Sequence, residues 1–352
     1  MRDPRLALVA LACAVLVRTA SAAPGKIKYT DTAMGTYVTV WFFTDNEEGA
    51  SKAAADVFAE MRRLDALMTN FNNTSEIGRI NAAAGDHPVE VSDETLLVLD
   101  RAIDVSKRSG GVFDITVGAF KGLWKFDEDM DADCKAGKPS CKLPDPADVK
   151  RRLALVNWKD LVIDHKKKTV FLRHKGMAIT LGGIAKGYAV DKCVAILKKD
   201  GFADFMVQAG GDMYVAGKKG DEPWQVGIRD PRGPSDALFA GMPITDHSFS
   251  TSGDYERGFV KDGVRYHHII DPRTGNPARA SRSVTIRARD AFTADAWSKV
   301  MFIYGWKAGM DIIKREHLDD FEVVWVDDKN DVHMTPGIAK ELRIVKQPTD
   351  GP

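Results

Sequence analysis

Apolar positions along this chain recur at two spacings, one that predicts helices and one that predicts strands. The helical spacing covers residues 51–68, where the apolar side chains would form one face of an amphipathic helix. A second helix is predicted to begin at Ser92, a residue type that caps helix starts well. This helix reaches Ser109, where the pair Gly110-Gly111 ends it.

A third helix organises the middle of the chain. Residues 169–172 and 177–181 are β-branched and apolar, and helical spacing begins directly after Gly182-Gly183 and ends at Gly201. The glycine pair is therefore predicted to lie at a strand-to-helix junction. Glycines let a ligand approach the backbone, free N–H groups at a helix start favour an anion, and Lys186 adds a positive charge. A tight turn needed only for packing is the alternative.

The remaining apolar segments have the composition of strands joined by short turns. Strands are predicted at residues 32–43, 205–208, 213–216, 224–228 and 284–288, and as a hairpin of 321–326 with 332–334. Thr293 is predicted to cap a last helix that contains Asp295 and Lys299. Because strands and helices mix without regular alternation, the pattern predicts an α+β fold with mixed, mostly antiparallel sheets.

Composition narrows the function. Fifty basic and fifty acidic residues cancel, so no overall field draws the chain to nucleic acid or to an anionic membrane. Any anion site must be local. With 352 residues, 44% of them hydrophobic, the chain can build one large domain or two intimate subdomains.

The N-terminus resembles an export signal. Arg2 and Arg5 precede an apolar run at residues 6–17, and small residues near Ala22 offer a cleavage point. We expect residues 1–22 to be a signal peptide and residues 23–352 to form a periplasmic or otherwise exported domain without a transmembrane span. Lipid attachment at Cys13 is the rival interpretation, but the preceding residues make a poor lipobox, so simple export is favoured.

Cysteine usage fits an oxidising compartment. Cys134 and Cys141 bracket a polar loop inside an acidic, proline-rich stretch, residues 127–149, which is predicted to be an insertion or loop rather than core. A disulfide between them would fix this insertion; the alternative is two unpaired surface thiols. Cys193 is predicted to be buried, and no cysteine spacing suggests zinc.

Three polar segments carry candidate chemistry. Phe71 heads a polar loop that either caps a helix or stacks on a ring, and the sequence alone favours the cap. Asp114 lies inside an apolar run, where a carboxylate either caps a turn or binds a polar ligand group. Residues 265–275 concentrate His, Asp, Arg, Thr and Gly, and His268 is expected to face the opposite side from His267.

Eight motifs, taken in order, together resemble the ApbE family, whose members are periplasmic FAD:protein FMN transferases. The motifs are Met34-Gly35-Thr36, Phe71 with Thr74-Ser75-Glu76, residues 113–118, residues 182–191, Gly210-Gly211-Asp212, residues 251–255, residues 268–275 and residues 293–296. The resemblance implies an α+β fold related to the T-fold, with FAD between two subdomains. It also implies transfer of FMN from FAD to a Thr or Ser of an exported acceptor protein, with release of AMP.

The resemblance assigns roles to residues. His268 would activate the acceptor hydroxyl, and Asp295 would bind Mg²⁺ with the carbonyl oxygen of Gly183. Contacts to the flavin, the adenosine or the pyrophosphate are implied for Met34, Phe71, Val112, Phe113, Asp114, Thr180, Gly182, Lys186 and Ile270. Two positions depart from the family pattern, because members usually carry Asp where this chain has Thr180, and the metal ligand Thr or Ser where it has Lys299.

These departures keep three hypotheses open. The first is the FMN transferase. The second is a related hydrolase that splits FAD into FMN and AMP, and the third is a non-catalytic exported protein that binds FAD. The chain lacks the Asp-Gly-x-Ser/Thr-Gly-Ala-Thr type of acceptor motif, so it is not expected to carry the covalent flavin itself.

Overall fold

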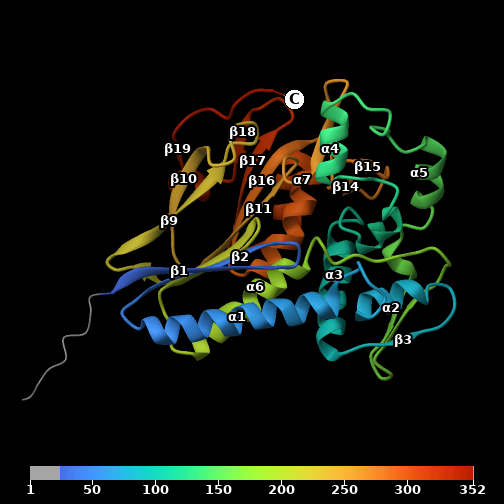
Figure 1. Ribbon diagram of the computed structural model, residues 1–352. Coiled ribbons are helices and arrows are strands. Elements are labelled where there is room, and N and C mark those ends of the chain that lie inside the picture. The colour runs from blue at the N-terminus through green and yellow to red at the C-terminus, as the bar shows by residue number, and fades with distance from the viewer. Residues whose placement is uncertain (1–23, 352) are drawn as a thin grey trace, which may run out of the picture.

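The computed structural model describes residues 24–351, so the predicted signal peptide and Cys13 lie outside the described residues. An antiparallel sheet of eight strands forms the centre of the molecule (Figure 1). Its strands follow one another across the sheet in chain order: β1 (Gly25–Ala33), β2 (Thr36–Thr44), β6 (Phe205–Ala209), β7 (Asp212–Ala216), β11 (His247–Gly253), β16 (Ser281–Ala288), β17 (Phe321–Asp327) and β18 (Val332–Met334).

The first two strands correct a prediction. The single strand expected at residues 32–43 is a hairpin whose turn is made by Met34 and Gly35, with φ angles of 52° and 69°. Strand β1 was missed because it lies at the sheet edge, where none of its residues is fully buried. Its weak apolar pattern gives little indication of a strand.

The central sheet is buried on both faces, and β17 shows how. Val323 and Trp325 join the larger core, whereas Val324 and Val326 join a smaller one on the opposite face. The smaller core lies under a second sheet with the strand order β19 (Arg343–Ile344), β10 (Leu238–Ile244), β9 (Glu222–Arg229) and β8 (Lys218–Lys219). All strand-to-strand pairings among residues 24–351 are antiparallel, which confirms the predicted α+β class.

Helices α1 (Glu47–Met68), α6 (Ala185–Lys199) and α7 (Ala291–Arg315) contribute buried residues to the larger core, and so does α3 (Asp93–Arg108). The cap of α7 corrects a prediction, because Asp290 and not Thr293 is its N-cap. The Asp290 carboxylate accepts a hydrogen bond from the Thr293 N–H at 2.7 Å. Both residue types cap well, so the sequence did not separate them.

A smaller group of elements lies beside the helices, at the right of Figure 1. It comprises the helices α2 (Glu76–Ala82) and α3 (Asp93–Arg108), the 3₁₀ helices η1 (Ile115–Phe120) and η2 (Trp158–Asp160), and the strands β3 (Val89–Glu90), β4 (Leu161–Asp164) and β5 (Thr169–Leu172). The second predicted helix is confirmed, since Ser92 caps α3 and Ser109 ends it.

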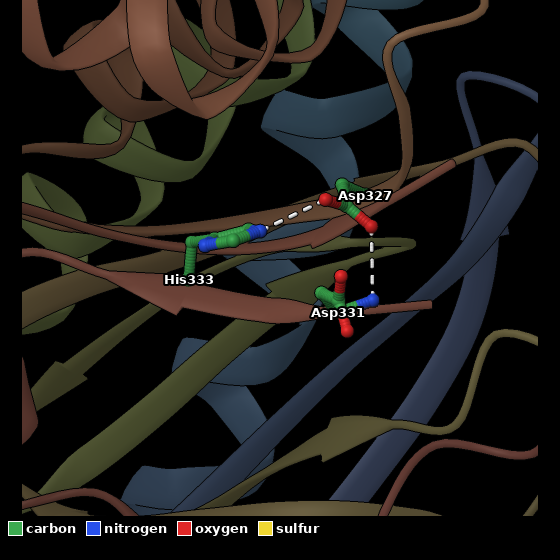
Figure 2. A group of neighbouring side chains, drawn as sticks. All are labelled: Asp327, Asp331 and His333. Atoms are coloured by element: carbon green, nitrogen blue, oxygen red, sulfur yellow. Dashed lines mark hydrogen bonds and ion pairs between the residues drawn. The ribbon is translucent and has the colours of Figure 1, made fainter. Parts of the chain in front are cut away.

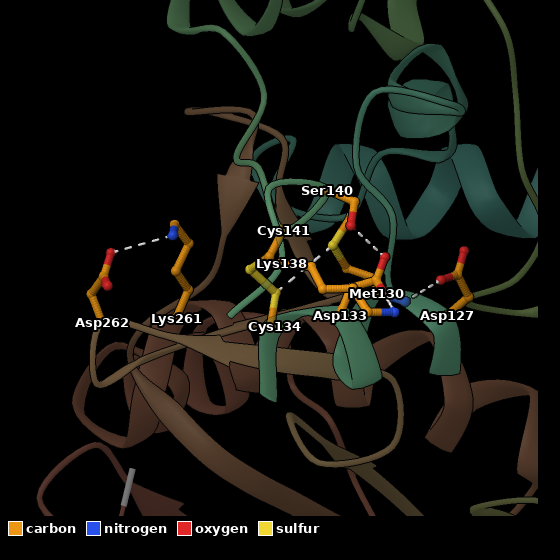
Figure 3. The surroundings of a disulfide bond; sticks show 9 residues. All are labelled: Asp127, Met130, Asp133, Cys134, Lys138, Ser140, Cys141, Lys261 and Asp262. Carbon is orange, nitrogen blue, oxygen red and sulfur yellow. Dashed lines mark hydrogen bonds and ion pairs between the residues drawn. A yellow bond between two sulfur atoms is a disulfide. The ribbon is translucent and has the colours of Figure 1, made fainter. Parts of the chain in front are cut away.

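The predicted insertion at residues 127–149 is more ordered than a loop. It contains α4 (Glu128–Lys135) and the start of α5 (Pro146–Leu153), and a disulfide joins Cys134 to Cys141 (Figure 3). Helix α4 packs against β12 (Gly258–Lys261), which pairs with β13 (Val264–His267). The remaining elements are β14 (Ile270–Asp271), β15 (Asn276–Pro277) and η3 (Ile338–Lys340).

In the part of the chain that the structure describes, we find no helix that combines the length and the apolar character needed to cross a membrane.

Candidate functional site

The glycine pair Gly182-Gly183 lies in a turn that leads directly into α6. No strand leads directly into it: the strand predicted at residues 169–172 is β5, but residues 173–184 pair with no neighbouring strand, so the strand predicted at residues 177–181 is wrong. The turn closes where the N–H groups of Ile184 and Ala185 both donate to the carbonyl oxygen of Leu181. The N-cap residue Ile184 makes no side-chain hydrogen bond to the start of α6, and Lys186 brings a positive charge to this first turn, which favours an anion there.

Four charged side chains meet directly behind this turn. Lys186 of α6 pairs with Asp212 at the start of β7, and its Nζ lies 3.9 Å from Oδ1 of Asp295 on α7. Lys299, one turn further along α7, donates to the Asp295 carboxylate. The two carboxylates are buried, while the side chains of Lys186 and Lys299 are 24% and 17% exposed. Two partly exposed lysine side chains therefore place their ammonium groups against two buried carboxylates.

Electrostatics shift the pKa values of the two carboxylates in this cluster in opposite directions. Burial acts against ionisation of Asp295, but the charges of Lys186 and Lys299 outweigh it and lower its pKa below the ordinary value. Burial, with the neighbouring charge of Asp295, raises the pKa of Asp212. Burial also acts against the charge on Lys186, yet the two carboxylates prevail and raise the pKa of Lys186 above its ordinary value. These shifts favour the ionised forms of Asp295 and Lys186, whereas burial disfavours the ionised form of Asp212.

Two glycines allow these elements to approach. A side chain at Gly187 would meet the carbonyl oxygen of Ala291 at 2.2 Å, so α6 and α7 touch through their backbones at this point. The Gly187 N–H donates to Oδ2 of Asp295 at 2.9 Å. The Gly183 Cα lies against Phe113 and Lys299, because a Cβ built there would be 3.4 Å from the Phe113 ring and 3.7 Å from the Lys299 side chain.

His268 directly follows β13. Its N–H and its Nδ1 atom both lie within 3.3 Å of the Arg257 carbonyl oxygen, and the Arg257 guanidinium donates to the carbonyl oxygen of Gly35. Surrounding protein atoms, the adjacent His267 and the charges of Lys299 and Arg257 lower the pKa of His268. The ring is exposed to solvent.

The two adjacent histidines differ as predicted. His267 is buried, its Nε2 lies 2.8 Å from the Ala278 carbonyl oxygen, and its ring meets Phe302 edge-on. His268 faces solvent. A neutral imidazole at this position can accept a proton from an incoming hydroxyl group.

The other predicted site residues fall into two groups. Met34 forms the β1–β2 turn, and Phe71 is 80% exposed with the Lys121 ammonium 5.1 Å from its ring. The Phe71 ring is open to a ligand, whereas Met34 is half-buried and packs against the larger core. Thr180 is half-buried and donates its N–H to the Ile115 carbonyl oxygen, and Ile270, also half-buried, begins β14.

Val112 and Asp114 are buried, and the alternatives for Asp114 can now be separated. Its carboxylate caps η1, accepting from the N–H and hydroxyl of Thr116, and also accepts from the Trp158 N–H. These bonds occupy both oxygens, so Asp114 supports the fold around Phe113. The Phe71 loop contains a cap as well, since Ser75 caps α2.

Sequence reasoning gave no role to two residues of this site. Asp212 belonged to the Gly210-Gly211-Asp212 motif of the family resemblance but received no role of its own. Arg257, which connects the Gly35 turn to His268, left no recognisable pattern, because its two contacts are made through backbone carbonyl oxygens that any residue can offer.

A second group of possible metal ligands lies elsewhere, at the β17–β18 hairpin: Asp327, Asp331 and His333 (Figure 2). The Asp327 carboxylate already accepts from the N–H groups of Lys329 and Asp331 and from the His333 ring. Its function here is to close the hairpin. Two surface cavities of about 380 and 390 Å³ also lie apart from the charged cluster, and none of the predicted site residues lines them.

Comparison with known proteins decides the family. The ApbE family model matches residues 34–325. The chain belongs to the ApbE family. A curated FAD:protein FMN transferase of Treponema pallidum is 32% identical over 308 residues, which cover 83% of this chain and 82% of that protein. Another, from Klebsiella pneumoniae, is 30% identical over 305 residues, which cover 86% of this chain and 90% of that protein.

Solved structures of the family share this fold. The crystal structure of the ApbE protein from Thermotoga maritima matches with a TM-score of 0.78 and 31% identity, and covers 93% of this chain and 100% of that one. The flavin transferase ApbE from Vibrio cholerae matches with a TM-score of 0.76 at 24% identity, covering 90% of this chain and 99% of that one, and shows the fold alone.

Proposed function

We propose that this chain transfers FMN from FAD to a Thr or Ser hydroxyl of an exported acceptor protein and releases AMP. One observation carries the proposal. Lys186 lies in the first turn of α6, the Lys299 side chain passes Gly183 just before that turn, and the charge of Lys299 lowers the pKa of His268, so anion-binding groups and a candidate base share one region. The curated relatives bear the name of this activity.

The reaction exchanges one phosphorus–oxygen bond for another. The acceptor hydroxyl oxygen attacks the phosphorus atom on the FMN side of the pyrophosphate, and its proton passes to the neutral ring of His268. The bond between this phosphorus and the bridging oxygen breaks, and AMP departs with that bonding pair. The products are a phosphoester of FMN with the acceptor and free AMP.

The charges required are those that the cluster provides. Negative charge accumulates on the pyrophosphate oxygens as the bond breaks, and positive groups held in place beforehand stabilise it. Lys186 and Lys299 are held by Asp295, and Lys186 also by Asp212, so their ammonium groups need not reorganise. The exposed ring of Phe71 offers a stacking surface for a flavin or adenine ring.

Covalent flavin on an acceptor tests the proposal. Purified protein, FAD and an acceptor with an Asp-Gly-x-Ser-Gly-Ala-Thr sequence are incubated, and the acceptor is analysed by mass spectrometry and in-gel fluorescence. We expect attachment of one FMN per acceptor. The variant His268→Ala should be slower by roughly 10²–10⁴-fold, whereas His174→Ala, at an exposed position of the smaller group of elements, should match the wild type. Absence of FMN on the acceptor would refute the transferase.

The exposed ring of His268 also favours a second candidate, hydrolysis of FAD to FMN and AMP, because water can reach the same base. AMP released at an equal rate with and without acceptor identifies the hydrolase. Retention of FAD without any AMP identifies a flavin-binding protein that lacks catalysis.

Export to the periplasm is proposed on two grounds. The N-terminal residues have the pattern of a cleaved signal peptide, and the Cys134–Cys141 disulfide suits an oxidising compartment. Fractionation of cells that express the full chain, with N-terminal sequencing of the product, tests this. A mature protein that begins near Ala23 in the periplasmic fraction is expected; an uncleaved cytoplasmic product would contradict it.

A further inference from the structure

We propose that the ammonium group of Lys299 takes the place of a divalent metal ion in this site, so that the chain binds and cleaves FAD without Mg²⁺. The inference rests on the proposed function for its substrate. What it adds is which cation lies beside the pyrophosphate: the Lys299 ammonium group and not a metal ion.

The groups around Asp295 do not fit Mg²⁺. Magnesium requires about six oxygen ligands in octahedral geometry. Here one carboxylate oxygen of Asp295 is paired with Lys299 and lies 3.9 Å from the Lys186 ammonium, and the other accepts from the Gly187 N–H. The Asp295 main-chain carbonyl oxygen is occupied too, because it accepts from Lys299 at 3.0 Å and from the Ser298 hydroxyl at 2.7 Å.

Charge leads to the same conclusion. A dication at Asp295 would lie beside two ammonium groups that are held there by buried carboxylates, and their repulsion would oppose its binding. Within residues 24–351, the one group of three or more acidic, His or Cys side chains close enough to share an ion is the Asp327 hairpin, which contains none of these residues.

Lys299 has the position and an unused N–H donor to serve as the cation. An ammonium group has three N–H donors. Two point to Asp295, at the carboxylate and at the main-chain carbonyl oxygen, so one is left for a ligand. The Lys299 side chain also passes the Gly183 backbone at the turn that leads into α6, and its charge acts on His268. An anion at this turn would therefore meet a fixed positive charge on the His268 side.

The experiment compares metal dependence in matched variants. Protein treated with EDTA is titrated with FAD by flavin fluorescence, with isothermal titration of MgCl₂ in parallel, and AMP release is followed by chromatography with and without added Mg²⁺. Wild type should bind FAD equally in EDTA and in Mg²⁺ and show no heat of Mg²⁺ binding. Its rate of AMP release should change less than about twofold when Mg²⁺ is added, since the Lys299 charge is present with and without the metal ion.

Three variants separate charge from packing. Lys299→Gln removes the charge at similar length, and FAD affinity in EDTA should fall roughly tenfold or more through loss of a charged hydrogen bond. Lys299→Thr should behave in the same way in EDTA and recover with Mg²⁺, because it vacates the Asp295 oxygens. Lys307→Thr, at an exposed position on α7, is the control and should resemble the wild type. Thermal unfolding identifies any variant that fails to fold, and Lys299→Arg then keeps the charge and should retain metal-free binding.

The outcomes are distinct. If wild type binds or cleaves FAD only with Mg²⁺, the inference is overturned while the proposed function stands. If wild type never releases AMP, the proposed function fails, and the binding titrations alone decide the inference. FAD affinity that is indifferent to EDTA and falls in Lys299→Gln supports it, and affinity unchanged in Lys299→Gln overturns it.

Discussion

Lys299 donates hydrogen bonds to both the carboxylate and the main-chain carbonyl oxygen of Asp295, one helical turn earlier on α7. At an exposed position such an i,i+4 pair would contribute only a few tenths of a kcal/mol. Here Asp295 is fully buried and also binds the first turn of α6 through Gly187. The pair therefore connects two helices and positions a cation at the same time.

Removing the buried carboxylate should destabilise the protein strongly. In Asp295→Ala, the Gly187 N–H loses its acceptor, Lys299 loses its carboxylate partner and Lys186 keeps only Asp212. We expect a loss of about 3–5 kcal/mol in the free energy of unfolding, measured by urea denaturation. Asp311→Ala, at an exposed position of the same helix, should change it by less than about 0.5 kcal/mol. Similar values for both variants would show that the cluster is not structurally important.

The backbone contact between α6 and α7 gives a second prediction. Alanine at position 187 places a methyl group 2.2 Å from the Ala291 carbonyl oxygen, so the helices must separate. We expect Gly187→Ala to cost about 1–3 kcal/mol and to lower FAD affinity, because Lys186 moves with the helix. Gly182→Ala offers a matched comparison, since the nearest atom to its Cβ is the Thr180 hydroxyl at 3.6 Å. Its stability should stay within about 1 kcal/mol of the wild type; an equal loss in both variants would argue against the contact.

Periodic segments were the predictable part of the fold. The amphipathic pattern of α1 and the cap residues of α3 gave both helices, because burial of one face requires apolar residues every three or four positions. Strand β1 was missed for the opposite reason. As a half-buried edge strand it needs no strong apolar pattern, and only its pairing with β2 defines it.

The candidate site was predictable where the residues have unusual chemistry. A glycine pair before a helix and an aspartate in an apolar run stand out in any sequence, although Asp114 proved to be a cap. Asp212 and Arg257 could not be assigned to the site, because only folding brings them close to the other site residues. Asp212 matters through its pairing with Lys186, and that pairing requires α6 to lie against β7.

The disulfide of the insertion provides a third prediction. Cys134 of α4 and Cys141 are seven residues apart in the sequence, and their disulfide closes the loop that follows α4 (Figure 3). Helix α4 packs on β12 of the β12–β13 hairpin. Replacing both with Ser should lower local stability by about 2 kcal/mol through the regained freedom of the open chain. Amide hydrogen exchange across residues 128–141 should accelerate correspondingly. Dithiothreitol should reproduce the effect in wild type and leave the double variant unchanged; exchange that is insensitive to reduction would contradict this role.

The pH dependence of AMP release gives the last prediction. Burial among protein atoms, His267, Lys299 and Arg257 lower the pKa of His268, while the bond to the Arg257 carbonyl oxygen acts in the opposite direction. A base must be neutral to accept a proton, so a lowered pKa keeps His268 active to lower pH. The acidic limb of log(kcat/KM) should therefore lie below the ordinary histidine value of about 6.5, with a flat profile from there to pH 8.

Lys299→Gln tests the sign of this shift. It removes one of the positive charges that disfavour protonated His268, so the acidic limb should move toward higher pH even where the rate itself falls. Lys307→Thr leaves the charge near His268 intact and should leave the limb in place. If the acidic limb of the wild type has an apparent pKa at or above the ordinary histidine value, another group controls proton transfer, because the charges facing His268 can only lower its pKa.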